Sequence, residues 1–129
     1  MNGRYLLDTN IVIALFANEP AAIDNLRIAE AVFVPSIVIG ELYFGAYRSS
    51  RVEANLKEVE EFATYAQVLS CDAETAQHYG RIKDNLRQAG HPIPENDIWI
   101  AATGLQYDLT VISRDVHFDE VVGLTVEKW

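Results

Sequence analysis

Four carboxylates occur in surroundings that are otherwise apolar: Asp8, Glu41, Asp97 and Asp115. Asp8 and Asp115 each follow a short apolar run, Glu41 lies within one, and Asp97 stands at the head of one. A buried carboxylate without a partner is costly, and this applies most clearly to Glu41. These four residues are therefore the first candidates for a functional site.

A shared site for these carboxylates would require positive charge. Their mutual repulsion would be severe unless protons or cations lay between them. A divalent cation is the natural solution, and oxygen-only ligands suit Mg²⁺ or Mn²⁺. Zinc is poorly supported, because His78, His91 and His117 are scattered and the single cysteine, Cys71, does not join them. Carboxylate-held magnesium is typical of phosphoryl-ester chemistry.

Each carboxylate also has a structural explanation. Asp8 and Asp115 could cap helices, Asp97 could complement the positive end of a helix dipole, and Glu41 could project from an exposed helix face. Taken singly, these explanations suffice. Taken together, carboxylates placed at strand ends and helix starts favour one shared site.

Short apolar strands alternate with helical patterns along the chain. We expect strands at Arg4–Leu7, Val32–Val34, Val68–Leu69, Thr110–Ile112 and Leu124–Val126. We expect helices from Pro20 to about Glu30, over Ile37–Tyr47, over Val52–Ala66, from Asp72 to Gly90, and over Ile98–Leu105 after Pro94. Expected cap residues are Thr9, Asn10, Ser36 and Asp72. The run Ile11–Phe16 fits either a strand or a buried helix.

This alternation predicts an α/β sandwich with a mostly parallel sheet. In such folds, ligands gather beyond the carboxyl ends of the strands. Asp8 and Asp115 both stand at predicted strand ends, which locates the expected site.

The composition is that of one globular domain covering residues 1–129. The longest apolar run, Ile11–Ala17, is too short to cross a bilayer, and the segment Met1–Arg4 lacks the organisation of a signal peptide. We therefore expect a cytoplasmic protein without a membrane segment. The net charge of −9 argues by itself against nucleic-acid binding, since phosphate contacts normally need a basic surface.

Four motifs together resemble those of PIN-domain nucleases, and specifically of the VapC-type toxins. They are Tyr5–Asn10, Pro35–Ser36 with Gly40–Leu42, Pro94–Ala102, and Val111–Phe118. One motif alone is weak, but the four in this order and at these spacings are specific. The resemblance covers essentially the whole chain.

The resemblance implies a three-layer α/β/α fold, with the run after Asp8 as a helix. It implies an acidic metal pocket of Asp8, Glu41, Asp97 and Asp115. It further implies a Mg²⁺- or Mn²⁺-dependent endoribonuclease, the toxin of a toxin–antitoxin pair, that is inhibited by a cognate VapB-like antitoxin and forms a homodimer. No residue is assigned to an organic cofactor.

Several neighbouring residues are candidates for supporting roles. Thr9, Asn10, Asn96 and Ser113 could orient carboxylates or water, although capping and turn formation would also explain them. Phosphates could be met by Arg48, Arg51, Arg81, Lys83, Arg87 or Arg114. Tyr43, Phe44 and Tyr47 could stack on bases but fit a core or dimer interface better. His117 could act as a general acid but fits a loop residue better, and we expect cleavage to need neither His117 nor Cys71.

Two other functions remain open at this point. One is a different Mg²⁺-dependent phosphoesterase, in which a strand-end aspartate acts as nucleophile; Asn10 occupies the position where the familiar Asp-x-Asp motif has its second aspartate. The other is a non-catalytic PIN-like module that only binds a partner.

Overall fold

The computed structural model describes residues 3–129 and is built on a parallel β-sheet. Its strands are β1 (Arg4–Leu7), β2 (Ala31–Pro35), β3 (Gln67–Leu69), β4 (Thr110–Ile112) and β5 (Val126–Glu127). The strand order is β3-β2-β1-β4-β5, and all four neighbouring pairs are parallel. The predicted α/β fold with a parallel sheet is confirmed.

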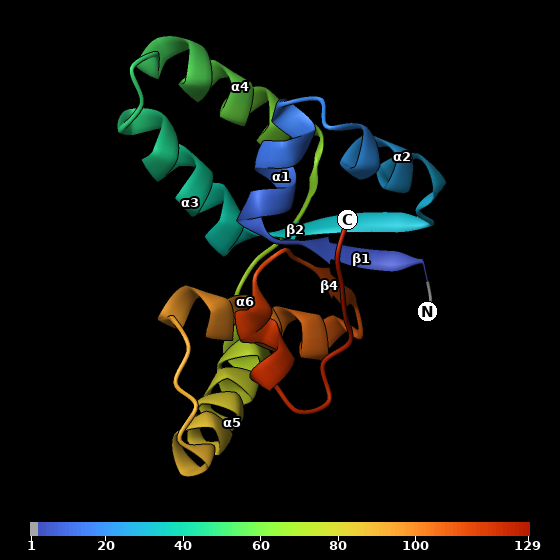
Figure 1. Cartoon of the computed structure of the whole chain (residues 1–129). Helices are drawn as coiled ribbons and strands as arrows, with labels where there is room; N and C mark the ends of the chain where they lie inside the picture. The colour runs from blue at the N-terminus through green and yellow to red at the C-terminus, as the bar shows by residue number, and fades with distance from the viewer. Residues whose placement is uncertain (1–2) are drawn as a thin grey trace.

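Helices cover both faces of this sheet. They are α1 (Thr9–Phe16), α2 (Pro20–Ile28), α3 (Ser36–Tyr47), α4 (Val52–Tyr65), α5 (Ala73–Ala89), α6 (Glu95–Tyr107) and the short 3₁₀ helix η1 (Val116–Glu120). Figure 1 shows α1 to α4 on one side of the strands and α5 and α6 on the other. The result is the expected three-layer α/β/α arrangement.

The two central strands form the middle of the core. Leu6 and Leu7 of β1 and Val111 and Ile112 of β4 are almost completely buried. Successive residues of a strand point to opposite faces, so an apolar pair in sequence needs cover on both faces. This explains why these strands read as continuous apolar runs.

The ends of α5 follow the predicted chemistry. Asp72 accepts a hydrogen bond from the backbone N–H of Thr75, and the Thr75 hydroxyl accepts one from the backbone N–H of Asp72. This reciprocal pair is a capping box. Gly90 ends the helix in the left-handed region, with φ of 74°, which glycine adopts without steric cost.

Three local predictions were wrong. The cap of α1 is Asp8, as its structural explanation allowed, and not Thr9 or Asn10; α3 begins at Ser36 after Pro35 without a side-chain cap. The last strand is Val126–Glu127, not Leu124–Val126. Asp8 caps α1 because it lies just before the helix, where its carboxylate can accept a hydrogen bond from the free N–H of Thr9. Thr9 and Asn10 already lie within the helix.

The remaining predicted elements lie close to their expected positions, and Ile11–Phe16 belongs to helix α1. Within residues 3–129, no helix combines the length and the apolar character needed to cross a membrane. Met1 and Asn2 of the segment Met1–Arg4, which is not expected to be a signal peptide, lie outside the described residues.

Candidate active site

Asp8 occupies the junction between β1 and α1 and is only 4% exposed. Its backbone N–H donates to the Ile112 carbonyl of β4 over 3.0 Å, which continues the sheet pairing one residue further. Its Oδ1 accepts a hydrogen bond from the Thr9 N–H at 2.8 Å, and its Oδ2 accepts one from the Ser113 hydroxyl at 2.7 Å. The carboxylate is therefore buried and held in one orientation.

Glu41 lies in the second turn of α3, the helix that follows β2 directly. Its Oε1 accepts a hydrogen bond from the Thr9 hydroxyl at 2.6 Å, and its Oε2 accepts a longer one from the Asn96 amide at 3.4 Å. Thr9 begins α1 and Asn96 lies in the first turn of α6. Glu41 thus connects three helices at the carboxyl edge of the sheet.

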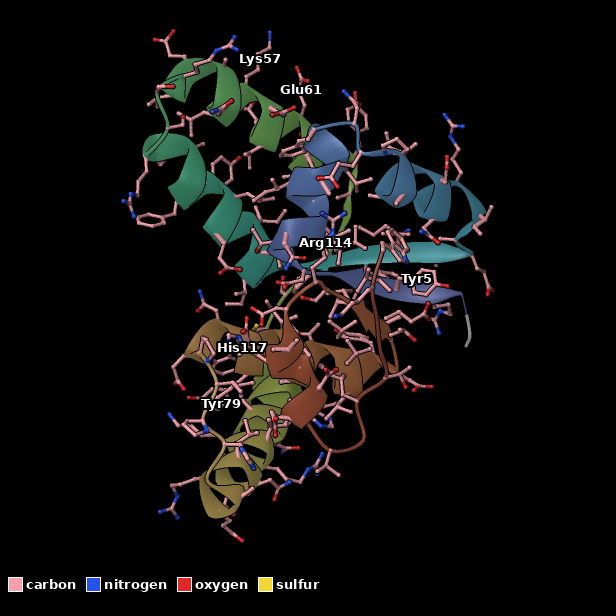
Figure 2. The ribbon with its side chains drawn as sticks, in the orientation of Figure 1. Tyr5, Lys57, Glu61, Tyr79, Arg114 and His117 are labelled. Carbon is pink, nitrogen blue, oxygen red and sulfur yellow. The ribbon has the colours of Figure 1, made fainter. Side chains whose placement is uncertain are left out.

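Asp97 and Asp115 are connected by a histidine. Asp97 is in the first turn of α6 and its side chain is 12% exposed. The His117 Nδ1 lies 2.9 Å from Asp97 Oδ2 and 2.9 Å from Asp115 Oδ1. Figure 2 shows His117 on the short helix beside α6. A helix start and the segment after β4 therefore share one charged cluster.

The loop after β4 is fixed by a second set of hydrogen bonds. The Ser113 hydroxyl, which donates to Asp8, also accepts from the Asp115 N–H at 2.9 Å. Asn10 Oδ1 accepts from the Arg114 N–H at 3.2 Å, and its amide lies 3.4 Å from both Asp8 Oδ2 and Ser113 Oγ. Polar side chains of α1 and of this loop therefore support Asp8 and Asp115 jointly.

Burial and mutual repulsion shift the protonation of the cluster. Burial raises the pKa of Asp8, and the charge of Glu41 adds to this, while the hydrogen bond from Ser113 opposes it. Burial raises the pKa of Asp97 to about 6, with His117 opposing the rise. The hydrogen bond to Asp97 raises the pKa of His117 in turn. These directions are those of a site short of positive charge.

The carboxylates line an open pocket of about 480 Å³, whose walls include Glu41, Asn96, Asp97 and Asp115. Asp8 is not among the lining residues, but it is close enough for its charge to raise the pKa of Asp97. A larger groove of about 550 Å³ and a smaller one of about 400 Å³ are lined mainly by apolar side chains, most of them from α1, α2, α3 and α4. Among these three, the acidic pocket alone carries the chemistry expected from the sequence.

The structure brings together all four proposed carboxylates and their four proposed supporting residues, Thr9, Asn10, Asn96 and Ser113. His117, considered as a general acid but expected to be a loop residue, lies instead on η1 and contacts both Asp97 and Asp115. The spacing Asp115-x-His117 at the end of a predicted strand was the available signal, because both residues then follow the same strand.

The predicted phosphate-binding side chains mostly have protein partners. Arg114 forms an ion pair with Glu19 at 2.9 Å, and Lys83 forms one with Glu95 at 3.1 Å. The guanidinium of Arg48 lies over the Phe44 ring, 5.4 Å from its centroid. Contact between any of these basic side chains and RNA stays a prediction.

The donor set fits a hard divalent cation. Oxygen atoms of several carboxylates face one pocket. Within residues 3–129, the basic side chain paired with Asp97 and Asp115 is His117, which is positively charged only when protonated. Mg²⁺ and Mn²⁺ favour such oxygen-rich sites. Asp8, Glu41, Asp97 and Asp115 are the residues that could hold it.

Comparisons with known proteins agree with this arrangement. The PIN domain family model matches residues 5–124. Ribonuclease VapC2 of Haemophilus influenzae is 36% identical over 129 residues, covering 98% of each chain. The tRNA(fMet)-specific endonuclease VapC of Shigella flexneri is 33% identical, again over 98% of each chain.

Solved structures show the same similarity in three dimensions. DNA-bound VapBC from Salmonella typhimurium matches with a TM-score of 0.90 and 28% identity, over 98% of each chain. VapBC2 from Rickettsia felis, bound to a promoter DNA fragment, matches with a TM-score of 0.89 and 26% identity, over 97% of this chain and 98% of that one. The chain therefore belongs to the PIN-domain family and, within it, to the VapC group.

Proposed function

We propose that the protein is a metal-dependent endoribonuclease that acts as the toxin of a toxin–antitoxin pair. One observation carries the proposal: Asp8, Glu41, Asp97 and Asp115 come from four separate parts of the chain and meet at the carboxyl edge of the sheet. The names of the relatives support the reaction class, since they are called ribonucleases and, in one case, a tRNA(fMet)-specific endonuclease.

The proposed roles follow from the contacts. Asp8, Glu41, Asp97 and Asp115 hold Mg²⁺ or Mn²⁺, which supplies positive charge at the scissile phosphodiester and makes water a better nucleophile. Thr9 orients Glu41, and Ser113 orients Asp8, each through a short hydrogen bond. Water would add to the phosphorus atom and lose a proton, while the P–O bond to the leaving oxygen breaks and that oxygen gains a proton. Carboxylates already held by hydrogen bonds would avoid reorganisation during this step.

RNA cleavage is the direct test. Total RNA and purified tRNA, including initiator tRNA, are incubated with the protein in EDTA and then with Mg²⁺ or Mn²⁺ restored. We expect no cleavage in EDTA and specific fragments after the metal is added. Full cleavage in EDTA would contradict the metal-dependent mechanism.

The antitoxin is part of the same proposal and would use the apolar grooves. The groove of about 550 Å³ is lined by apolar side chains such as Leu15, Phe16 and Phe62, with Glu58 and Glu61 also among its lining residues. An amphipathic segment with basic residues beside its apolar face would suit this surface and the net charge of −9. The solved VapBC structures support a VapB-like partner.

A homodimer is also proposed. Phe44 and Tyr47 on α3 are 62% and 65% exposed, whereas Tyr43 is half-buried against the core. Exposed aromatic side chains on one helix are typical of an interface. Sedimentation velocity should give a dimer for the wild type and a monomer for Phe44→Glu/Tyr47→Glu. We place the protein in the cytoplasm, where its RNA substrate is.

A further inference from the structure

His117 takes up a position that a carboxylate-only description of the site leaves unexplained. Its Nδ1 is 2.9 Å from an oxygen of Asp97 and 2.9 Å from an oxygen of Asp115. One ligand atom from each of the three residues lies within 4.8 Å of the others. The ring nitrogen therefore shares a single small volume with two carboxylate oxygens.

These distances match those between neighbouring donors around one ion. Donor atoms that lie about 2.1 Å from an octahedral ion at right angles are about 3.0 Å apart. Both nitrogen-to-oxygen distances in the cluster are close to this value. A proton on Nδ1 satisfies both carboxylates when no ion is bound, and the neutral ring exposes a lone pair in the same direction.

The local backbone holds the ring in place. Asp115 caps the helix η1, and its Oδ1 accepts a hydrogen bond from the His117 N–H at 3.0 Å. The Asp115 N–H is in turn held by Ser113 at 2.9 Å. His117 and Asp115 are thus positioned by one short turn.

We propose that His117 is a nitrogen ligand of the metal ion bound by Asp97 and Asp115. This inference rests on the proposed function, because it concerns the same metal site, and it replaces the expectation from the sequence that cleavage does not need His117. A neutral imidazole adds a donor without adding negative charge to a cluster of four carboxylates. Both ions favour oxygen ligands, but Mg²⁺ is the harder ion and accepts an imidazole nitrogen less readily than Mn²⁺, so the site should favour Mn²⁺ over Mg²⁺.

Pulsed electron paramagnetic resonance of the Mn²⁺-loaded full-length protein tests the ligand directly. We expect a ¹⁴N coupling typical of directly bound imidazole, which changes to a ¹⁵N pattern when histidine is labelled with ¹⁵N. The coupling should be lost in His117→Ala and in His117→Gln. It should persist in His78→Ala and His91→Ala, whose ring nitrogens contact Arg81 and Glu120 instead.

The ion preference gives a second readout. Loss of even an outer partner of a ligand typically weakens metal binding by about 10- to 100-fold. We therefore expect His117→Ala to weaken Mn²⁺ binding by at least about tenfold and to change Mg²⁺ binding less. The two control variants should keep the wild-type ratio of affinities.

The outcomes separate this inference from the proposed function. Mn²⁺ that binds the wild type, is released by Asp97→Asn and shows no histidine coupling would overturn the role of His117 alone. A protein that binds neither Mn²⁺ nor Mg²⁺ would overturn the metal site itself, and the inference with it. Because the coupling is measured on the wild type, a misfolded variant does not affect this test.

Discussion

At the scale of single residues, the site combines burial with an excess of negative charge. Asp8 and Asp97 are almost covered by protein, yet each faces other carboxylates. Hydrogen bonds from Ser113, Thr9 and His117 offset part of the cost. The part of this cost that the hydrogen bonds do not offset favours a bound cation, which would hold both carboxylates in their ionised form.

The pH dependence of stability follows from these residues. The pKa of Asp97 is raised from 3.8 to about 6, so the folded state binds more protons than the unfolded state within this range. Stability is therefore highest below the ordinary pKa and falls as the pH rises through 6. The raised pKa of His117 also makes stability fall as the pH rises above 6.5, the ordinary pKa of histidine.

We expect the metal-free protein to lose about 1–2 kcal/mol of stability through Asp97 between about pH 5 and about pH 8. Urea denaturation in EDTA across this range measures the loss. Asp97→Asn should flatten the curve, whereas Asp24→Asn, an exposed change on α2, should not. If stability depended on pH in the same way in all three proteins, the pKa of Asp97 would not be raised by folding.

Ser113 provides a second test at this scale. It donates to Asp8 at 2.7 Å and is fully buried. Removing a partner of a buried charged group costs about 1–3 kcal/mol, so Ser113→Ala should destabilise the protein by this amount. It should also weaken Mn²⁺ binding, measured by titration. Unchanged stability and affinity would mean that Asp8 does not depend on this bond.

The four candidate carboxylates could be picked out from the sequence because each lies within or next to an apolar run. Asp8 and Asp115 follow buried strands, and the edge where parallel strands end is fixed by the fold class. His117 could not be placed in the same way. Its contact with Asp97 depends on the angle between η1 and α6, which no local pattern specifies.

At the scale of elements, the strands and helices with strong periodicity were predicted well. The amphipathic α4 and α5 and the apolar β1 and β4 lie where expected. The run Ile11–Phe16 could not be assigned from its own residues, because a buried helix and a buried strand are equally apolar. β5 has only two residues, and its register depends on pairing with β4 rather than on its own pattern.

Gly104 lets α6, which carries Asp97, pack closely against β4. A Cβ on Gly104 of α6 would meet Val111 Cγ2 at 2.9 Å and Leu124 Cδ1 at 3.1 Å. Gly104→Ala should therefore displace α6, which carries Asp97, and cost about 1–3 kcal/mol. Gly80→Ala on α5 has open space and is the matched control, expected to be neutral or stabilising by up to about 1 kcal/mol. Chemical denaturation that ranks the two variants the other way would contradict this packing.

At the scale of the whole molecule, the net negative charge opposes RNA binding, and a bound metal and a basic partner would each offset part of it. The chain carries 19 acidic and 10 basic residues. Bound cations would offset part of the negative pocket, and the remaining charge favours weak non-specific RNA binding. It also favours a basic antitoxin, whose removal should release the activity.

Expression in cells tests this balance. We expect growth arrest when the protein is produced without its antitoxin, and normal growth when a VapB-like partner is co-expressed. Asp8→Asn and Asp97→Asn should relieve the arrest, and Asp24→Asn should not. Arrest that persists in both site variants, at equal protein levels, would mean that toxicity does not come from cleavage.

The most direct test of the central claim combines a stability measurement with a cleavage assay on the same variants. Asparagine is nearly isosteric with aspartate and caps helices about as well, but it removes a negative charge from the cluster. For Asp8→Asn and Asp97→Asn, we predict an unchanged or higher melting temperature without metal, together with lost RNA cleavage in Mg²⁺ or Mn²⁺. Wild-type cleavage by both variants would show that these aspartates serve only the fold, and would contradict the proposed active site.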